Sequence, residues 1–167
     1  NGSFLPGWIS WENRTVYAMN GEGYKFRAEL ALRRVRVFET DTADGSEREI
    51  YTSPEEWKIQ SIYCTDIDRD EEAELLVLCW KHGSYGNHMP FWVKHNDIAF
   101  SQHIFIYDLH PDRLKPVWMS SAMGLKVADW EIWEGLTGYG WDSKIGFISP
   151  GGEETWWHWG SWGIEEY

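Results

Sequence analysis

An internal repeat of about 68 residues constrains this chain more than any other feature. VRVFE at 35–39 recurs as IFIYD at 104–108, EIYTS recurs as PVWMS, and Trp57–Tyr63 aligns with Leu125–Glu131. The three offsets are 69, 67 and 68 residues. Repeats of this length indicate stacked copies of one supersecondary unit, none of which can bury its apolar face alone.

The stretch from Trp57 to Trp80 is the most informative part of the unit, because an acidic loop separates two apolar runs there. Both runs, WKIQSIYCT and LLVLCW, are rich in β-branched and aromatic residues and predict strands. The loop DIDRDEEAE places carboxylates at its first, third, fifth and ninth positions, and the seventh would offer a backbone carbonyl. Calcium takes roughly six to eight such oxygens. The sequence therefore predicts a calcium site made by Asp66, Asp68, Asp70, Glu72 and Glu74.

The flanks distinguish this loop from an EF-hand. An EF-hand shares the opening D-x-D-x-D, but it needs a bidentate acid at position twelve and a helix on each side. Position twelve here is Val77, and both flanks read as strands. The site is therefore expected in a strand-loop-strand hairpin. A solvated acidic turn without a metal is the alternative.

These residues resemble the calcium-loop hairpin of FG-GAP repeats, also called VCBS-type repeats, which form the blades of integrin-like β-propellers. Those repeats read as an apolar strand, then D-x-D/N-x-D-G-x-x-D/E, then an L-L-V-type strand, and Asp66, Asp68, Asp70 and Glu74 match residue by residue. The resemblance covers roughly residues 35–148 and implies four-stranded antiparallel blades with calcium on one hairpin. Such propellers have roughly seven blades, and this chain has room for about two and a half to three.

We therefore predict an all-β fold, a partial β-propeller-like array of antiparallel blades within a single domain, residues 1–167. Its units span approximately 1–57, 58–125 with an insertion at 81–102, and 126–167. Open stacks leave sheet edges and faces uncovered. The chain is thus a piece of a larger propeller, half of a homo-oligomer that completes one, or an open array capped by its terminal segments.

Two positions depart from the family pattern. Glu71 replaces the loop glycine, and if that position needs a positive φ, the glutamate costs on the order of 1 kcal/mol. Carrying the offset of 68 into the next unit gives Glu134, Leu136, Gly138 and Asp142 as counterparts of the four acids. The two middle acids are lost, so the second loop is expected to be a glycine turn without metal.

Local patterns elsewhere are less specific. Residues 24–39 are ambiguous between a helix from Ala28 to Arg34 and a pair of strands, although Val35 to Phe38 alternates as a strand does. Asp44-Gly45 predicts a hairpin turn with a positive φ. Four histidines in and near the insertion, at spacings of six, seven and eight residues, match no zinc pattern.

Charge and composition exclude some classes of protein. The net charge of −12, from 15 basic and 27 acidic residues, argues against a nucleic-acid partner. No apolar run approaches the roughly 18 residues of a membrane span, and NGSFLPGW is no signal peptide. We expect an extracellular or cell-surface protein whose leader is absent from this chain. Cys64 and Cys79 would not lie opposite each other in the hairpin and are expected as free thiols.

Aromatic residues offer candidate ligand sites in two places. Trp80 stands at the entrance of the insertion, which carries Tyr85 and Trp92, and near the C-terminus Trp157 and Trp159 would share one face of a strand. Flat rings beside polar groups can stack on a pyranose while their neighbours bond its hydroxyls. Burial of the same rings in a core is the alternative.

No catalytic motif is present among the common ones: the chain lacks G-x-S-x-G, H-E-x-x-H, a P-loop and a Cys-His arrangement. The acid pairs Glu153-Glu154 and Glu165-Glu166 are adjacent in sequence and resemble solvated surface. We predict a non-catalytic, calcium-binding surface or secreted module that recognises a glycan or a protein. The alternatives are a fragment of a polysaccharide-active enzyme and a purely structural blade segment.

Overall fold

The computed structural model describes residues 5–20, 24–82, 100–120, 123–161 and 163–167. These residues form twelve β-strands and contain no helix, so none of them forms a helix that could cross a membrane. The predicted all-β class is confirmed. The helix considered for Ala28 to Arg34 is not formed, because a tight turn at Leu32 and Arg33 divides that segment into two strands.

The strands form three four-stranded antiparallel sheets, and in each sheet consecutive strands are neighbours. The first sheet contains β1 (Arg14–Asn20), β2 (Tyr24–Ala31), β3 (Arg34–Asp41) and β4 (Glu47–Thr52). The second contains β5 (Lys58–Thr65), β6 (Glu74–His82), β7 (Phe100–His110) and β8 (Arg113–Met119). The third contains β9 (Asp129–Thr137), β10 (Gly140–Ile148), β11 (Glu154–Gly160) and β12 (Gly163–Glu166). No sheet closes on itself.

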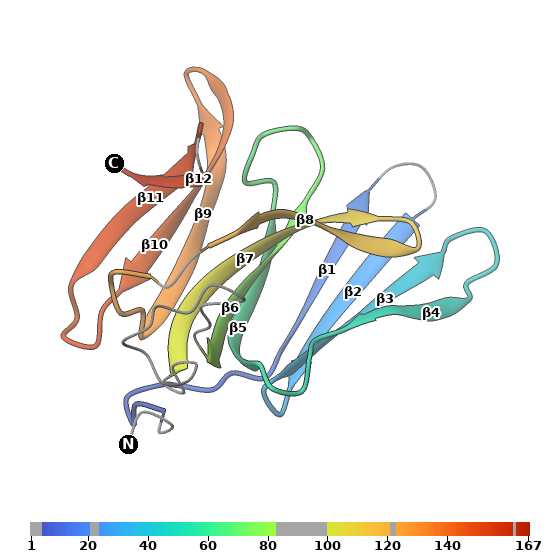
Figure 1. Cartoon of the computed structure of the whole chain (residues 1–167). Coiled ribbons are helices and arrows are strands. Elements are labelled where there is room, and N and C mark those ends of the chain that lie inside the picture. Colours follow the sequence, from blue (N-terminus) through green and yellow to red (C-terminus); the bar gives the residue numbers. More distant parts are fainter. Residues whose placement is uncertain (1–4, 21–23, 83–99, 121–122, 162) are drawn as a thin grey trace, which may run out of the picture.

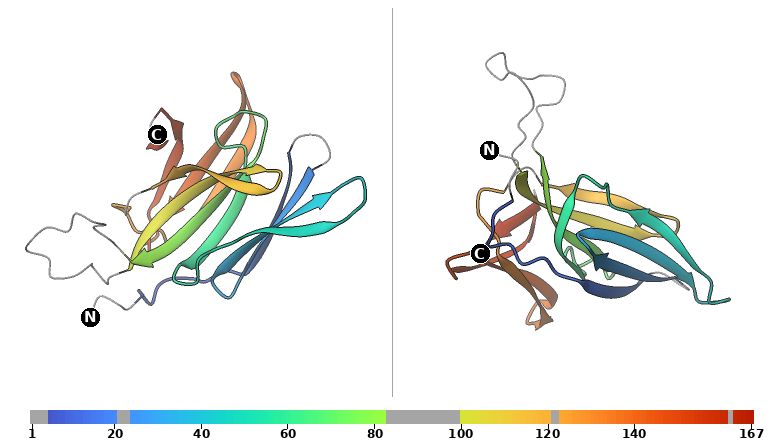
Figure 2. Two further views of the ribbon diagram at one scale, coloured as in Figure 1. Left: turned by 45° about the vertical axis from the view of Figure 1, so that its right-hand side comes forward. Right: turned by 90° about the horizontal axis from the view of Figure 1, so that it is seen from below.

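The three sheets stand side by side, with the second between the other two (Figures 1 and 2). Their first strands are neighbours, since β1 contacts β5 and β5 contacts β9, and the last strands β4 and β8 also meet. The segments that repeat in the sequence take the same place in successive sheets: β3 and β7, β4 and β8, β5 and β9. The repeat is therefore one four-stranded meander.

Strand β6 explains why the second sheet is central. Leu75, Val77 and Cys79 join a core cluster shared with the first sheet, whereas Leu76 and Leu78 join another cluster shared with the third. All five side chains are buried. A sheet covered on both faces gives an unbroken apolar strand in place of alternation, which is why the sequence reads LLVLCW here.

Both cysteines are free in the structure. Cys64 pairs with Leu75 and Cys79 with Ile59, so the two thiols are not opposite each other, as the predicted register implies. Gly45 has a φ of 73°, in agreement with the turn expected at Asp44-Gly45. The strands around Cys64 and Cys79 are held by backbone pairing and side-chain packing, without a disulfide between these two residues.

The repeat offset of 68 residues does not place the loop of the third sheet's first hairpin correctly. Glu134 and Leu136 lie within β9, and the pair Thr137 and Gly140 closes a turn of two residues. Gly140 has a φ of 107°, a conformation that favours glycine. The third sheet thus has a tight glycine turn where the second has an acidic loop.

Candidate metal centre

The acidic loop joins β5 to β6 beyond the closing pair Thr65 and Glu74. Within the loop Arg69 has a φ of 61° and Glu71 a φ of 73°, both in the left-handed region. The expectation that Glu71 occupies a glycine-type position is therefore correct. A side chain there strains the backbone, and the loop keeps this conformation because its amides are bonded to its own carboxylates.

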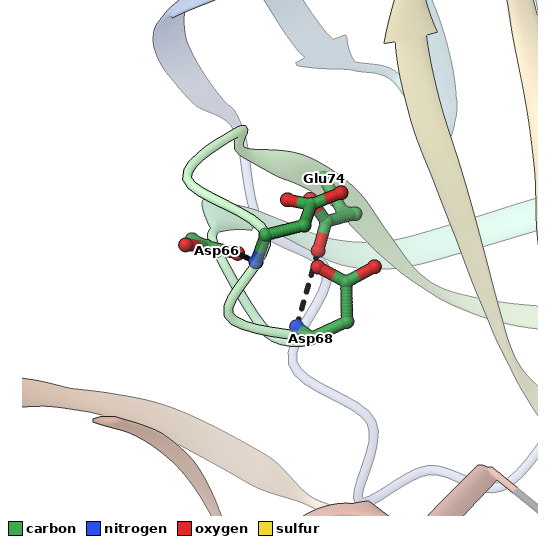
Figure 3. A group of neighbouring side chains, drawn as sticks. Asp66, Asp68 and Glu74 are labelled. Atoms are coloured by element: carbon green, nitrogen blue, oxygen red, sulfur yellow. Dashed lines mark hydrogen bonds between the residues drawn. The ribbon is translucent and has the colours of Figure 1, made fainter. Parts of the chain in front are cut away.

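Four of the five predicted ligand residues come together in this loop. One carboxylate oxygen from each of Asp66, Asp68, Asp70 and Glu74 can be chosen so that all lie within 4.8 Å of one another. Asp68 and Glu74 point toward each other, as Figure 3 shows. The side chain of Glu72 is exposed and outside this group, and its amide donates to Asp70 Oδ1 at 2.9 Å.

Backbone amides hold the carboxylates in place. Asp66 accepts hydrogen bonds from the amides of Asp70 at 3.0 Å and Glu71 at 2.9 Å. Glu74 Oε1 accepts from the amides of Ile67 and Asp68, each at 3.2 Å. The donors turn the loop inward around the acids, so the group is preorganised by the chain itself.

Two oxygens of the group have no partner. Glu74 is fully buried, and its Oε2 and the Oδ1 of Asp68 accept no hydrogen bond among the described residues. Buried polar atoms are nearly always bonded, and an orphaned one costs about 1–3 kcal/mol. The two atoms are therefore positioned for a partner that the described residues do not supply.

The electrostatics of the group point the same way. Burial raises the pKa of Glu74 to about 10, and the charge of the neighbouring Asp68 adds to the rise. Burial also raises the pKa of Asp68 to about 6, and the neighbouring Asp70 and Asp66 add to the rise. Carboxyls crowded in this way hold protons unless a cation replaces them.

Contacts from both neighbouring sheets anchor the loop. The buried side chain of Asn20, at the end of β1, donates to the carbonyl of Ala73 at 2.9 Å and accepts from its amide at 3.0 Å. Ile67 is buried in the core cluster shared with the third sheet. The sequence analysis missed Asn20, since nothing local links it to a loop about fifty residues away.

An open hollow of about 650 Å³ lies beside the loop. Asp66 and Glu71 line it together with Met19 of the first sheet and Tyr139 and Trp141 of the third. The hollow gives solvent and ions a route to the edge of the acidic group. It also gathers exposed apolar side chains, since Tyr139 and Met19 are largely uncovered.

Those of the chosen aromatic residues that the structure describes are buried or half-buried. Trp80 is 5% exposed, and its Nε1 donates to Gln60 Oε1 at 2.8 Å. Trp157 and Trp159 pack against the core cluster between the second and third sheets. The apolar face of a sheet must be shielded from water, and the rings of Trp157 and Trp159 shield the face between the second and third sheets. Tyr85 and Trp92 lie outside the described residues.

The other candidate side chains that the structure describes do not gather into a site. His103 is buried, with its ring nitrogens near Ser101 and Ser120, and His82 stacks on Phe100. In β12 the neighbours Glu165 and Glu166 pair with different residues of β11, and adjacent strand residues point to opposite faces. Such a pair cannot act as two facing carboxyls.

The acidic loop can therefore hold a metal ion, and its oxygen ligands suit a hard cation. Two orphaned oxygens and the backbone amides that hold the carboxylates in place make the loop fit such an ion. No family model, no curated protein and no solved structure matches this chain.

Proposed function

We propose that this chain is a non-catalytic, calcium-binding module of propeller-like blades that recognises a glycan or a protein outside the cell or at its surface. Metal binding is supported above all by two buried oxygens that have no hydrogen-bond partner among the described residues, Glu74 Oε2 and Asp68 Oδ1. A divalent ion between them would satisfy both oxygens and offset half of the charge of the four crowded carboxylates. The identity of the partner rests on the sequence and on the surface discussed below.

Calcium fits the ligand set better than other common ions. The group offers only carboxylate oxygens, with no histidine or cysteine, which disfavours zinc and copper. Magnesium usually keeps several waters and takes one or two carboxylates, whereas calcium accepts six to eight oxygens in flexible geometry. Four acids on one short loop, with a backbone carbonyl at Glu72, fit calcium.

The blade interpretation is supported by the order of strands. Each sheet is a meander of four consecutive strands, and the first strands β1, β5 and β9 lie next to one another. Sheets that fan out from neighbouring first strands are the arrangement of propeller blades. On this interpretation the loop stabilises the hairpin where three blades meet, since Asn20 and Ile67 tie it to both sides.

The test is a thermal melt of the whole chain in chelator and in millimolar calcium, with Asp68→Asn and Glu72→Gln as matched variants. Each variant removes one acid from the same loop, but only Asp68 belongs to the buried group. Binding to the folded state at a hundredfold excess over Kd stabilises by about 2.7 kcal/mol. We expect calcium to raise the Tm of the wild type and of Glu72→Gln.

Asp68→Asn should lose most of this calcium response. An equal calcium response in both variants would show that the ion binds elsewhere, and an unchanged wild-type melt would reject the calcium site. Magnesium at the same concentration serves as the control for ionic strength and for the size of the ion. Among the described residues no specific observation favours the enzyme fragment or the purely structural segment.

A further inference from the structure

The face of the third sheet that points away from the second is a feature that the metal site leaves unexplained. Alternation along the strands puts one set of residues on this face, and we call it the outer aromatic face: Glu131, Trp133, Lys144, Trp156, His158, Glu165 and Tyr167. Their neighbours Ile132, Ile145 and Trp157 belong to the core on the other side. The face lies on the orange and red sheet in Figure 1.

Two tryptophan rings lie flat on this face because glycines lie beneath them. A Cβ atom on Gly135 would be 2.8 Å from the ring of Trp133, and one on Gly146 would be 3.0 Å from the ring of Trp156. Only glycine permits so close an approach. The underside of each ring rests on backbone, and Trp133 remains 41% exposed.

Polar groups stand between the rings. Lys144 pairs with Trp133 across β9 and β10, and its Nζ lies 5.2 Å from the centre of that ring and 4.8 Å from that of Tyr167. Trp133, Lys144, Trp156 and Tyr167 together line a shallow depression of about 390 Å³. The depression thus offers aromatic surface with a hydrogen-bond donor in its lining.

This face differs from the faces that the sheets use to pack on one another. In the second sheet, a row of Tyr63, Leu76 and Ile106 packs against the third sheet. The same places in the third sheet hold Glu131, Gly146 and Trp156.

The carboxylate of Glu131 and the absence of a side chain at Gly146 disfavour packing of another aliphatic sheet on this face. Burying Glu131 and Lys144 without partners would cost several kcal/mol by loss of hydration. The occupant of this face must bring polar groups along with a flat apolar surface.

We propose that the outer aromatic face binds a neutral oligosaccharide. The apolar faces of successive pyranose rings would stack on Trp133 and Trp156, while Lys144 donates and Glu131 accepts hydrogen bonds from the hydroxyls. The carboxylates of Glu131 and Glu165 on the same face favour an uncharged chain over an anionic one. This inference rests on the proposed function, since it names the ligand class and the surface for that recognition.

The experiment is calorimetric titration of the whole chain in calcium with cellohexaose, xylohexaose and mannohexaose. The variants Trp133→Ala and Trp156→Ala each remove one ring, and Tyr139→Ala removes an exposed ring from the turn between β9 and β10 as the matched control. We expect at least one hexasaccharide to bind and each tryptophan variant to weaken its affinity about tenfold. The control should bind as the wild type does.

Several results would overturn the proposal. One is the absence of binding by all three sugars at millimolar concentration, and another is an equal loss in Tyr139→Ala. Sedimentation of the same samples tests whether a second copy of the chain occupies this face. A wild-type dimer that Trp133→Ala dissociates would assign the face to self-association. Calcium stabilisation without sugar binding would reject this proposal alone, and sugar binding without calcium stabilisation would reject only the metal site.

Discussion

At the scale of single residues, the acidic loop combines a predictable ligand set with contacts that only the fold reveals. The spacing of Asp66, Asp68, Asp70 and Glu74 predicts which acids meet, because alternate residues of a tight loop turn inward together. The spacing cannot predict that Glu74 is fully buried or that the side chain of Asn20 hydrogen-bonds the backbone of Ala73. Both depend on neighbouring sheets whose contacts are remote in sequence.

Glu71 provides a direct test of the strained loop. Its φ of 73° costs a non-glycine residue about 1 kcal/mol, so Glu71→Gly should raise the free energy of unfolding by up to about 0.5–1 kcal/mol, after the extra entropy of glycine in the unfolded chain. Urea denaturation in calcium measures the change. Glu72→Gly is the matched control, because it removes a neighbouring exposed glutamate whose φ is not positive and should destabilise. Equal effects of the two changes would contradict the role of backbone strain.

The buried carboxyls predict opposite pH dependence with and without metal. In chelator, Asp68 has its pKa raised to about 6 and Glu74 to about 10. A raised carboxyl pKa stabilises the folded state fully below the unfolded pKa of about 4, and this contribution is lost as the pH rises through the folded pKa. We therefore expect the unfolding free energy of the chelated protein to fall between pH 5 and pH 8.

Calcium should remove or reverse this slope, because the ion takes the place of the protons. Urea denaturation at three pH values in each condition measures both slopes. The control is Glu74→Gln, which keeps the shape of the protonated side chain but does not titrate, and it should flatten the slope in chelator. A chelated wild type that gains stability toward pH 8 would contradict the expected protonation of the loop.

At the scale of elements, the sequence predicts the strands better than it predicts which sheets pack against them. The hairpin around the loop, the turn at Gly45 and the repeated strands were all legible from alternation and turn chemistry. The segment 24–39 was ambiguous because Ala28 to Arg34 contains good helix formers. Pairing of Ala28 with Val37 and burial of both side chains in the first core cluster decide in favour of strands.

The third sheet shows where alternation alone fails. The sequence correctly separates Trp157 and Trp159 from Trp156 and His158, since adjacent strand residues face opposite ways. It cannot say which face meets another sheet. The side chains of Trp157 and Trp159 are half-buried against the second core cluster, and their role as ligand residues stays a prediction.

At the scale of the whole molecule, the two outer faces of the stack end differently. The first sheet carries ion pairs on the face turned away from the second: Arg27 with Glu47 at 2.8 Å and Arg36 with Glu49 at 3.0 Å. The third sheet carries the outer aromatic face. We therefore expect one solvated end and one end that takes the proposed ligand, and closure with a second copy is the alternative that sedimentation tests.

A buried polar network joins the second sheet to the third and predicts how the whole stack responds to a core change. The side chain of Gln60 accepts hydrogen bonds from Trp80 Nε1 at 2.8 Å and Gln102 Nε2 at 2.9 Å. Its own Nε2 donates to the carbonyls of Val127 and Ala128, just before β9. Gln60 is 1% exposed, so water cannot replace it freely.

Gln60→Met should therefore lower the free energy of unfolding by about 2 kcal/mol or more, because it keeps the length of the side chain but removes the partner of the indole N–H of Trp80 and of the Ala128 carbonyl. Leu78→Met is the matched control, since Leu78 is also buried in the second sheet and a volume-conserving apolar swap costs less than about 1.5 kcal/mol. Chemical denaturation monitored by tryptophan fluorescence measures both. Because the network ties the sheets together, the loss should appear as a shift of one cooperative transition, and equal costs for the two variants would mean that shape, not hydrogen bonding, holds this interface.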